Sequence, residues 1–598
     1  MSSALRNTPH YETLIAADPS NARHLIACST YELHQPSLSE YGTVVYVSSN
    51  GGTSWKPTLN VTAASFGSGD PACAFGRDGN AYFAELEERK GPDGKQHGHT
   101  VVYASHDGGE RWGRPFVGRQ SDREYIAVDT TGGRFNGRVY VNGAMSLQSL
   151  ENDPRRINQI TNNVGVLVST DHGRSFHLEA LLSPLDDHYT FADGNAVVMS
   201  DGTYVVLYPD LENEYATPAV PGEIPFALKV ISSTDGGFSF TKAVTVAKFT
   251  TQKFGIVSVP PSMAVDTSNG PFRNRLYVTW AQLSDGRSQI FLSYSSDKGK
   301  TWSAPVTVSD DLARKPGEGP DANEPEVAVN RKGIVGVSWM DRRDSAHDLG
   351  YYERFTASFD GGETFAPSVR VATSPATFYR GSEFALDAMG SGGGDPTALA
   401  HGQPLQATIG YNSRFSFIGG DTEGLAADSN GIFHALWVDN RTGVPQAWTA
   451  PIEVSGEAVP NGSPQLAHER DITKDVAIEF GDARFDRANA EVSVDAYLVD
   501  TSKISISGPV QARLITLTSG MGRPRLIVGS ENGIEERGAI VDFTSSLPDG
   551  KLAPNERARA VHLVFHIDDL RPDTESASTY ADSLQDFVTF TARVFSPA

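Results

Sequence analysis

The sequence has few cysteines, no long apolar run and no excess of basic residues. Its 598 residues include two cysteines, Cys28 and Cys73, and no Cys/His spacing typical of a zinc site. We expect two buried thiols, with a disulfide between them as the alternative. No stretch of about 18 apolar residues occurs, which argues against membrane insertion. The formal net charge of −23 argues against nucleic acid and anionic membrane surfaces as partners.

The chain contains six copies of an eight-residue motif. Its frame is Ser-x-Asp/Asn-x-Gly-x-(Thr/Ser/Arg)-(Trp/Phe), and the copies start 57 to 64 residues apart. Between copies lie short runs rich in Val, Ile, Tyr and Trp, separated by Gly, Asn and Asp, a pattern typical of strands. A period near 60 residues with about four short strands predicts a radial array of four-stranded sheets. The third position of the motif is Asn50, Asp107, Asp171, Asp235, Asp297 and Asp360.

The number of opening strands predicts seven repeats rather than six. The seventh repeat, which follows Asp421, has three strand-like segments and no copy of the motif. We therefore predict a seven-bladed β-propeller whose last blade borrows its fourth strand from the N-terminal segment. A six-bladed ring with extra strands is the alternative. The opening strands begin near Glu12, Asp70, Arg123, Asp193, Pro260, Glu324 and Thr422.

The repeated motif is interpreted as structural. It falls between the third and fourth strands of a repeat, where a tight turn is needed. Glycine at the fifth position permits positive φ, the Asp side chain accepts hydrogen bonds from turn amides, and the final aromatic residue can pack between sheets. A catalytic residue is not needed six times around a ring.

These motifs resemble the Asp-box, or BNR repeat, of the sialidase superfamily, over roughly residues 10 to 454. The resemblance implies a β-propeller whose motifs lie on the face opposite the active site. Asp-box propellers include sialidases, other glycan-processing enzymes and non-enzymatic binding proteins. The segments around Asp341 and Asp439 also look like those of secreted bacterial seven-repeat proteins. A secreted or periplasmic location is thus implied, although this chain shows no signal core, and a cytoplasmic location is the alternative.

The pattern changes after about Val454. Residues 455–464 have the composition of a linker, and residues 465–598 contain neither the motif nor tryptophan. Alternating runs such as AEVSVDAYLVD predict an immunoglobulin-like β-sandwich. We expect this second domain to have a supporting or binding role.

The residues at the start of the opening strands form the first candidate site. Asp70, Arg123, Asp193 and Glu324 are predicted to be catalytic, with Glu12 contacting substrate, because equivalent positions of a radial array converge around its axis. Carboxylates held together perturb each other's pKa, which suits acid–base catalysis, and a pair can flank a glycosidic bond. The alternatives are a solvated acidic rim or a structural cation such as calcium. No cofactor is predicted.

Two further segments contribute candidates. Asp341 and Arg342 follow a predicted second strand and are assigned to substrate binding; an internal Asp341–Arg343 pair is the structural alternative, and it leaves Arg342 freer than Arg343. A long insertion from about Ala372 to Asp421 is of the kind that often carries function. From it and the residues just after it we assign Tyr379 and Arg380 to catalysis and Asp421 and Glu423 to substrate binding.

The resemblance to sialidases suggests roles for these residues. Sialidases use an arginine triad, a Tyr–Glu nucleophile pair and an Asp acid/base. Arg123, Arg342 and Arg380 are the candidates for the clamp, Tyr379 with Glu324 for the nucleophile pair, and Asp70 for the acid. The sequence lacks the Phe/Tyr-Arg-Ile-Pro motif of that family. We expect a monomeric glycoside hydrolase or related enzyme acting on a glycan or glycoconjugate, with a non-catalytic glycan- or protein-binding propeller as the alternative.

Overall fold

The computed structural model of the chain divides into two compact units. The first comprises Met1–Ala357 with Pro367–Glu457, and the second comprises Ser358–Ala366 with Ala458–Ala598. The structure describes all residues except 36–37, 63–66, 91–95, 147–161, 183–188, 191–193, 212–222, 253–259, 285, 312–319, 346–349, 378–418, 421, 571–586 and 598. Regular structure in this described part consists of strands and short 3-10 helices. None of those helices has the length and apolar character needed to cross a membrane.

Strands of the first unit pair antiparallel with their neighbours in chain order. The first sheet contains β1 (His10–Ala17), β2 (Leu25–Gln35), β3 (Leu38–Ser48) and β4 (Lys56–Thr62). Next come β5 (Ser68–Phe75), β6 (Ala81–Lys90), β7 (Gln96–Ser105), β8 (Phe116–Val128), β9 (Val139–Ser146), β10 (Asn162–Ser169) and β11 (His177–Leu182). These seven form one continuous sheet because the long β8 pairs with β7 through its first half and with β9 through its second half.

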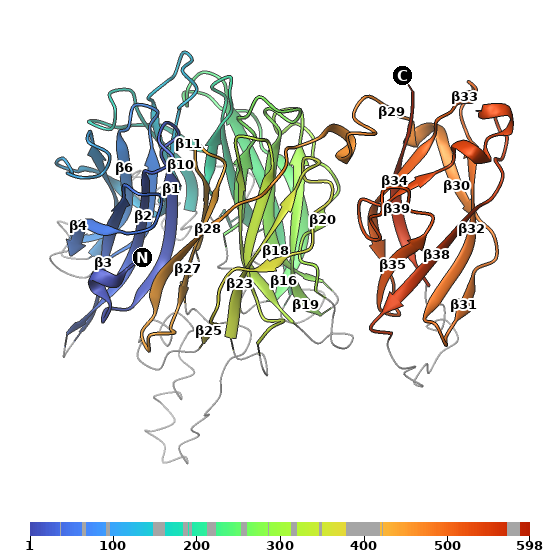
Figure 1. The fold of residues 1–598 in the computed structure, drawn as a ribbon. Helices are drawn as coiled ribbons and strands as arrows, with labels where there is room; N and C mark the ends of the chain where they lie inside the picture. Colours follow the sequence, from blue (N-terminus) through green and yellow to red (C-terminus); the bar gives the residue numbers. More distant parts are fainter. Residues whose placement is uncertain are drawn as a thin grey trace, which may run out of the picture. The chain divides into compact units, whose positions relative to one another are not determined.

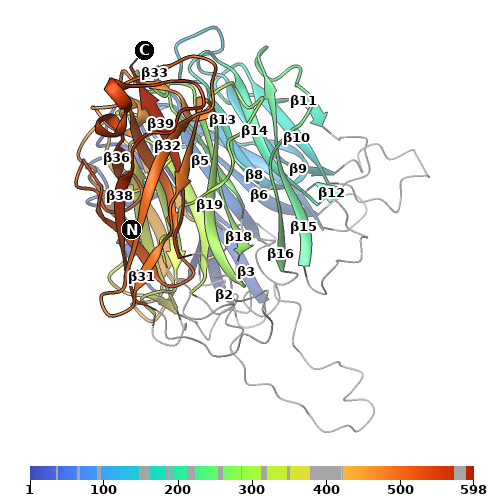
Figure 2. The ribbon, with the colours of Figure 1, turned by 90° about the vertical axis from the view of Figure 1, so that its right-hand side faces the viewer.

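The remaining strands of this unit form four smaller sheets. The first contains β12 (Tyr189–Thr190), β13 (Ala196–Val198), β14 (Tyr204–Leu211), β15 (Glu223–Ser233) and β16 (Val244–Gln252); Figure 2 shows its last three strands side by side. The second contains β17 (Ser262–Val265), β18 (Leu276–Ser284), β19 (Arg287–Ser295) and β20 (Val306–Thr307). The others are β21 (Ala322–Val329), β22 (Val335–Asp341), β23 (Gly350–Ser358), β24 (Val369–Arg370) and β25 (Ala376–Thr377), then β26 (Gly424–Ala427), β27 (Phe433–Asp439) and β28 (Gln446–Ile452).

Central strands of these sheets are buried on both faces because sheets pack against each side of them. Every residue of β22 and of β27 is buried, and both strands read as nearly continuous apolar runs. Between adjacent sheets, Tyr140 of β9 stacks on Tyr204 of β14 with ring centroids 4.1 Å apart. Cys28 and Cys73 lie in another hydrophobic cluster of this unit. Both are free, buried thiols, as we expected from the sequence.

Within the described residues, seven strands contact one another in a closed cycle. Their order is β1, β5, β8, β13, β17, β21 and β26, and β26 contacts β1 again. Figure 1 shows the same closure, with β27 and β28 in orange beside β1 in blue. A radial array requires such a ring of innermost strands. The cycle therefore supports the predicted number of repeats, while the assignment as a seven-bladed propeller remains a prediction.

The N-terminal residues run along the last sheet. The Met1 ammonium group donates a 2.9 Å hydrogen bond to the Ala447 carbonyl. The amide of His10 donates to Pro445 O at 3.0 Å, and the Ser2 hydroxyl donates to Gln446 Oε1 at 2.8 Å. The N-terminal segment thus lies along β28, but the sheet of β26, β27 and β28 has three strands, so a borrowed fourth strand remains a prediction.

All six repeated motifs fold into the same turn. In each, the first-position Ser hydroxyl accepts the N–H of the fifth-position Gly at 2.8 to 2.9 Å. The third-position Asp or Asn Oδ1 accepts the N–H of the seventh residue at 2.9 Å in every copy. These bonds satisfy turn amides that would otherwise be unpaired, so the structural interpretation of the motif is supported.

The ring of inner strands has two distinct ends. We call the end at which these strands begin the upstream end; β5, for example, starts there at Ser68. Because β5, β6 and β7 are successively antiparallel, Phe75 pairs with Ala81 and Ala81 pairs with Ser105 at the opposite end. The turn that follows Ser105 carries the motif. We call that opposite end the motif end.

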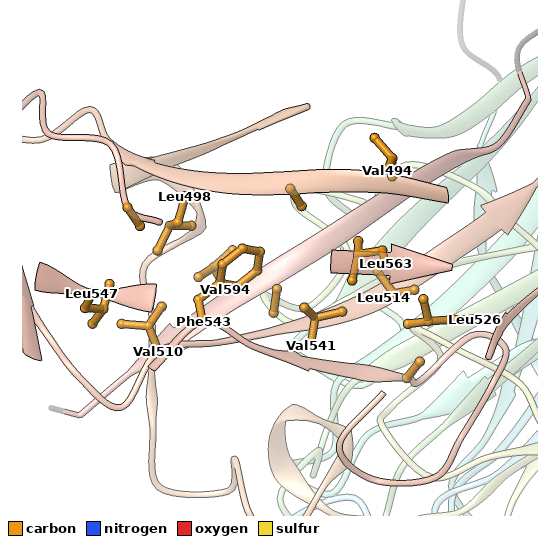
Figure 3. Packing of buried hydrophobic residues seen from close by; sticks show 14 of the residues in the cluster. Val494, Leu498, Val510, Leu514, Leu526, Val541, Phe543, Leu547, Leu563 and Val594 are labelled. Atoms are coloured by element: carbon orange, nitrogen blue, oxygen red, sulfur yellow. The ribbon is translucent and has the colours of Figure 1, made fainter. Parts of the chain in front are cut away.

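The second unit has one core between two antiparallel sheets. One sheet contains β29 (Arg470–Asp471), β39 (Thr589–Ser596), β34 (Gln511–Thr518) and β36 (Ile540–Asp542). The other contains β30 (Val476–Phe480), β31 (Arg484–Asp486), β32 (Glu491–Asp500), β38 (Val561–Asp568) and β35 (Arg523–Val528), and β33 (Ile506–Ser507) pairs with β37 (Lys551–Leu552). Residues of β32 alternate between buried and half-buried, as expected for a strand covered on one face. Figure 3 shows Leu514, Val541 and Leu563 from both sheets gathered in this core. An immunoglobulin-like topology remains a prediction.

Candidate functional site at the upstream end

Four of the predicted site residues share an unusual backbone conformation. Glu12, Asp70, Arg123 and Glu324 have φ of 49°, 49°, 59° and 51°, the left-handed region that side chains other than glycine rarely adopt. Each lies at a register irregularity in its inner strand, the position of a β-bulge. The repeat alignment read from the sequence thus placed four equivalent residues at equivalent points of the structure.

The first three of these residues are linked side by side. The carboxylate of Glu12 accepts the Asp70 amide at 3.2 Å and the Thr30 hydroxyl at 2.8 Å. The carboxylate of Asp70 in turn accepts the Arg123 amide at 3.3 Å and lies 3.6 Å from its guanidinium Nη1. Each acidic side chain therefore holds the left-handed residue of the next repeat. The strain of the bulges is offset by bonds among the candidate site residues themselves.

Arg342 and Arg343 differ sharply although they are adjacent in the chain. Arg343 is bound on both sides: its Nη2 lies 2.7 Å from Asp341 Oδ2 and its Nη1 lies 2.5 Å from Asp310 Oδ1. Arg342 is 1% exposed, yet its Nε and Nη2 have no hydrogen-bond partner among the described residues. Its guanidinium lies 4.2 Å from the ring centre of Tyr351.

Asp341 takes the structural role that the sequence offered as an alternative. Its Oδ2 also accepts the Trp339 indole N–H at 2.8 Å, so both carboxylate oxygens are occupied within its own segment. Asp439, Trp437 and Arg441 repeat this arrangement in the next sheet. We therefore assign Asp341 to holding the loop, a role that Arg342 does not share.

Two buried glutamates, Glu353 of β23 and Glu423 just before β26, lie near each other. Glu353 and Glu423 are 2% and 1% exposed, and none of their four carboxyl oxygens has a hydrogen-bond partner among the described residues. Burial raises the pKa of Glu353 to about 7. The pKa of Glu423 is raised well above its usual value by burial and by the charges of Glu353 and Glu324. Two buried acidic groups this close to each other disfavour simultaneous ionisation.

Glu326 lines the axis of the ring. A cavity of about 140 Å³ is bounded by residues from all seven inner strands, including Tyr125, Asn195, Ser262 and Glu326. The Ser262 hydroxyl donates to Glu326 at 2.7 Å, and burial raises the pKa of Glu326 to about 8. A further carboxyl, Glu85, also has its pKa raised to about 8 by burial. Burial thus favours the neutral form of both carboxyl groups.

The segment before β26 connects Glu12 to the buried pair. The Glu12 amide donates to the Gly419 carbonyl at 2.6 Å. A Cβ atom at Gly420, which has φ of 85°, would lie 2.6 Å from Glu12 Cγ, so this close approach requires glycine. Gly419 in turn lies beside the Glu423 carboxyl, since a Cβ there would be 3.9 Å from Oε1. Glu12 and Glu423 thus belong to one neighbourhood.

Some predicted residues cannot be placed, and others were missed. Asp193, Tyr379, Arg380 and Asp421 lie outside the described residues. Sequence reasoning did not single out Glu326, Glu353 or Tyr351. A signal was available for Glu353, because it interrupts the aromatic-rich strand GYYERFTAS, where a carboxylate must be either exposed or specially held. No group of three or more His, Cys, Asp or Glu in the described part is arranged to hold a metal ion.

Comparison with known proteins gives only distant similarities. No protein-family model and no curated protein matches the chain. Among solved structures, a Hadza microbial sialidase is 14% identical with a TM-score of 0.39, over 70% of this chain and 74% of that one. The intramolecular trans-sialidase of Ruminococcus gnavus is 11% identical with a TM-score of 0.37, over 75% and 96%. An α-L-arabinofuranosidase from Fusarium graminearum is 12% identical with a TM-score of 0.36, over 64% and 92%. These values are too low to assign a family or an activity.

Proposed function

We propose that the chain is a glycoside hydrolase that cleaves an acidic glycan at the upstream end of the ring. The observation that carries this proposal is the repeated left-handed bulge, which presents Glu12, Asp70, Arg123 and Glu324 at equivalent points of four repeats. Strained, non-glycine residues of this kind cluster at functional sites. Carboxyl and guanidinium groups are also the side chains that glycosidic bond cleavage in an acidic sugar demands.

The two catalytic carboxyl groups of this proposal are Asp70 and Glu324. Hydrolysis requires one protonated carboxyl to donate to the leaving oxygen and one carboxylate to activate water or attack the anomeric carbon. Asp70, held 3.6 Å from Arg123, suits the charged role. Glu324 lies near the buried Glu423, whose pKa its charge helps to raise, and we assign Glu324 the acid role. This assignment reverses the roles suggested by the sialidase resemblance.

Arg342 supplies the recognition of an anionic substituent. A buried guanidinium with unpaired N–H groups costs free energy until an anion accepts those hydrogen bonds. A sugar carboxylate accepts two of them at once. We assign Arg342 to this contact, with Arg123, and we retain Arg380, Tyr379, Asp193, Asp421, Glu12 and Glu423 as further proposed site residues.

The proposed fold, accessory domain and location rest on the resemblance to Asp-box propellers. We propose a seven-bladed Asp-box propeller followed by an immunoglobulin-like accessory domain, acting outside the cytoplasm on a glycan or glycoconjugate. The N-terminal residues along β28 support the seven-fold ring, because they hydrogen bond to the last sheet in the manner expected of a closed propeller.

The test is release of fluorophore from a panel of glycosides of ulosonic acids, uronic acids and neutral sugars. We expect release from one acidic class, and a loss of about 10²- to 10⁴-fold in kcat/KM for Glu324→Gln and Asp70→Asn. Asp297→Asn, the same change at the motif end, serves as the control and keeps full activity. Binding of an acidic sugar without release from any substrate would replace the enzyme with a binding propeller. Unchanged activity in both variants would overturn the assigned site.

A further inference from the structure

A second hollow lies at the motif end, between the second and third copies of the motif. Its volume is about 520 Å³, within the range of about 300 to 1,000 Å³ found for ligand sites. Side chains of His106, Asp107, Arg111, Trp112, Arg114 and Arg174 line it. Since the motif end is opposite the start of β5, this hollow is distinct from the candidate site described above.

The hollow is positively charged in a strongly acidic protein. Among the residues that line it are three arginines, Arg111, Arg114 and Arg174, and one carboxylate, Asp107. Asp107 is held by the side chain and amide of Arg111, and these hydrogen bonds lower its pKa to about 2. No ion pair is formed by Arg114 or Arg174 within the part of the chain that the structure describes. With a net charge of −23 overall, such a concentration of guanidinium groups is a local exception.

Arg111 occupies a position where the turn needs only a hydroxyl. In the motifs of Asp171, Asp235 and Asp297, a Ser or Thr hydroxyl at the seventh position donates to Asp Oδ2 at 2.5 to 2.6 Å. In the second motif, Arg111 Nε makes the equivalent bond to Asp107 Oδ2 at 2.7 Å. This bond does not use the terminal nitrogens of the guanidinium group, and the side chain is 89% exposed. The fold therefore does not explain the charge.

Trp112 also departs from the pattern of its repeats. The indole N–H groups of Trp55 and Trp302 donate to a glycine carbonyl of their own motif, at 3.0 and 3.2 Å. Trp112 donates instead to the Thr58 hydroxyl of the preceding repeat, at 3.1 Å. Its ring is further fixed by an edge contact with Phe83, with centroids 6.3 Å apart. The result is an immobilised indole on the wall of a cationic hollow.

We propose that this hollow binds an acidic oligosaccharide, as a site separate from the proposed hydrolytic centre. The Trp112 face receives a sugar ring, and Arg111, Arg114 and Arg174 bind its carboxylate or sulfate groups. Guanidinium groups donate paired hydrogen bonds to such anions, and an aromatic face accepts the apolar face of a ring. A nucleic acid also combines rings with anions, but the net charge of −23 repels an extended polyphosphate. The saccharide is therefore the favoured ligand.

Calorimetric titration of the full chain tests this site with four probes: a trigalacturonate, a sulfated heparin tetrasaccharide, neutral maltotriose and a ten-residue oligothymidylate. We expect at least one acidic saccharide to bind and maltotriose not to bind. Arg111→Thr restores the residue type of the other motifs and so keeps the turn, while it weakens binding by about tenfold or more. Arg174→Ala gives a similar loss. Lys300→Ala, at the same motif position in the fifth copy, serves as the matched control and leaves the affinity unchanged.

Three results would overturn the proposal. They are an absence of binding by either acidic saccharide, an affinity unaffected by Arg111→Thr and Arg174→Ala, or tighter binding of the oligothymidylate than of the saccharides. Hydrolysis is measured in the same variants, and we expect it to be unchanged. If the hydrolytic proposal is wrong, the wild type hydrolyses none of the glycosides. If only the proposal of a second binding site is wrong, the wild type still hydrolyses its substrate.

Discussion

The two ends of the strand ring differ in how their buried polar groups are hydrogen bonded. At the motif end, each third-position Asp or Asn accepts the same backbone hydrogen bond at 2.9 Å, and Ser or Thr hydroxyls complete the turn. At the upstream end, Arg342 keeps Nε and Nη2 without hydrogen-bond partners among the described residues, and the pKa of Glu353 is raised to about 7 by burial. Within the described residues, these Asp and Asn side chains of the motif end are paired by the chain itself, whereas several buried polar groups of the upstream end are not.

This difference separates structural repetition from function. A turn that repeats with the same bonds stabilises the fold in the same way in every copy. A site must vary from repeat to repeat, since its substrate has no rotational symmetry. The upstream positions do vary, from Glu12 and Asp70 to Arg123, on one shared backbone conformation. At the motif end, the second motif differs from the other copies in the roles of Arg111 and Trp112.

The largest effect should come from exchanging each of the two adjacent arginines for methionine. Arg343→Met leaves Asp341 and Asp310 without their partner and should lower the free energy of unfolding by about 3 to 5 kcal/mol. Arg342→Met removes buried donors that have no hydrogen-bond partner among the described residues, and it should not lower this free energy. Urea unfolding followed by tryptophan fluorescence measures the first unit selectively, because all seven tryptophans lie in it. Equal losses in the two variants would contradict the contrast between them.

A second prediction concerns pH. The pKa of Glu326 is about 8 and that of Glu353 about 7 in the folded protein, against about 4.5 in the unfolded chain. Between these values the folded state holds protons that the unfolded state releases, so stability falls as pH rises from about 4.5 to about 8. Each such group contributes about 1.4 kcal/mol per pH unit. Stability does not depend on these groups below that window.

Glu353→Gln should therefore reduce the slope of the free energy of unfolding against pH by about 1.4 kcal/mol per pH unit between pH 5 and 7. The free energy of urea unfolding, measured at half-unit steps of pH, gives the slope. Glu457→Gln changes an exposed carboxyl in the same unit and should leave the slope unaltered. A slope that Glu353→Gln does not change would mean that this carboxyl is ionised in the fold, contrary to its burial.

The smallest effects should come from the motif end, and they should be alike. Ser175→Ala and Thr301→Ala each remove one hydroxyl that donates to an Asp at 2.6 Å. We expect a loss of about 1 kcal/mol for each, because the turn keeps its backbone bonds. Activity toward any substrate should be unchanged. A loss of activity in either variant would show that the motif end takes part in catalysis.

Much of the fold was predictable because it repeats. The spacing of the six motifs gave the period of the strands, and the alignment of opening strands placed Glu12, Asp70, Arg123 and Glu324 at one structural position. Arg343 was separable from Arg342 because only Arg343 has a counterpart, Arg441, in the next repeat. Each of these inferences compares equivalent positions, which a single sequence with internal repeats permits.

The buried carboxyl cluster was not predictable in the same way. Glu353 and Glu423 come from a third strand and from the end of an insertion, so no repeat equivalence joins them. Their contact depends on how far apart the chain segments lie after the ring closes, and that distance is set by packing rather than by sequence period. The same reason hides the hollow at Trp112, since the redirection of its indole toward Thr58 depends on the neighbouring sheet.

The most direct test of the account is the binding of acidic monosaccharides to Arg342→Met. N-acetylneuraminate and glucuronate would be titrated into the wild type, Arg342→Met and the control Arg370→Met, which changes an exposed arginine of β24, with unfolding measured on the same samples. We expect that one of these sugars binds the wild type and the control, and that Arg342→Met loses about tenfold or more in affinity without losing stability. Equal affinity for wild type and Arg342→Met, or a marked loss of stability in Arg342→Met, would contradict it.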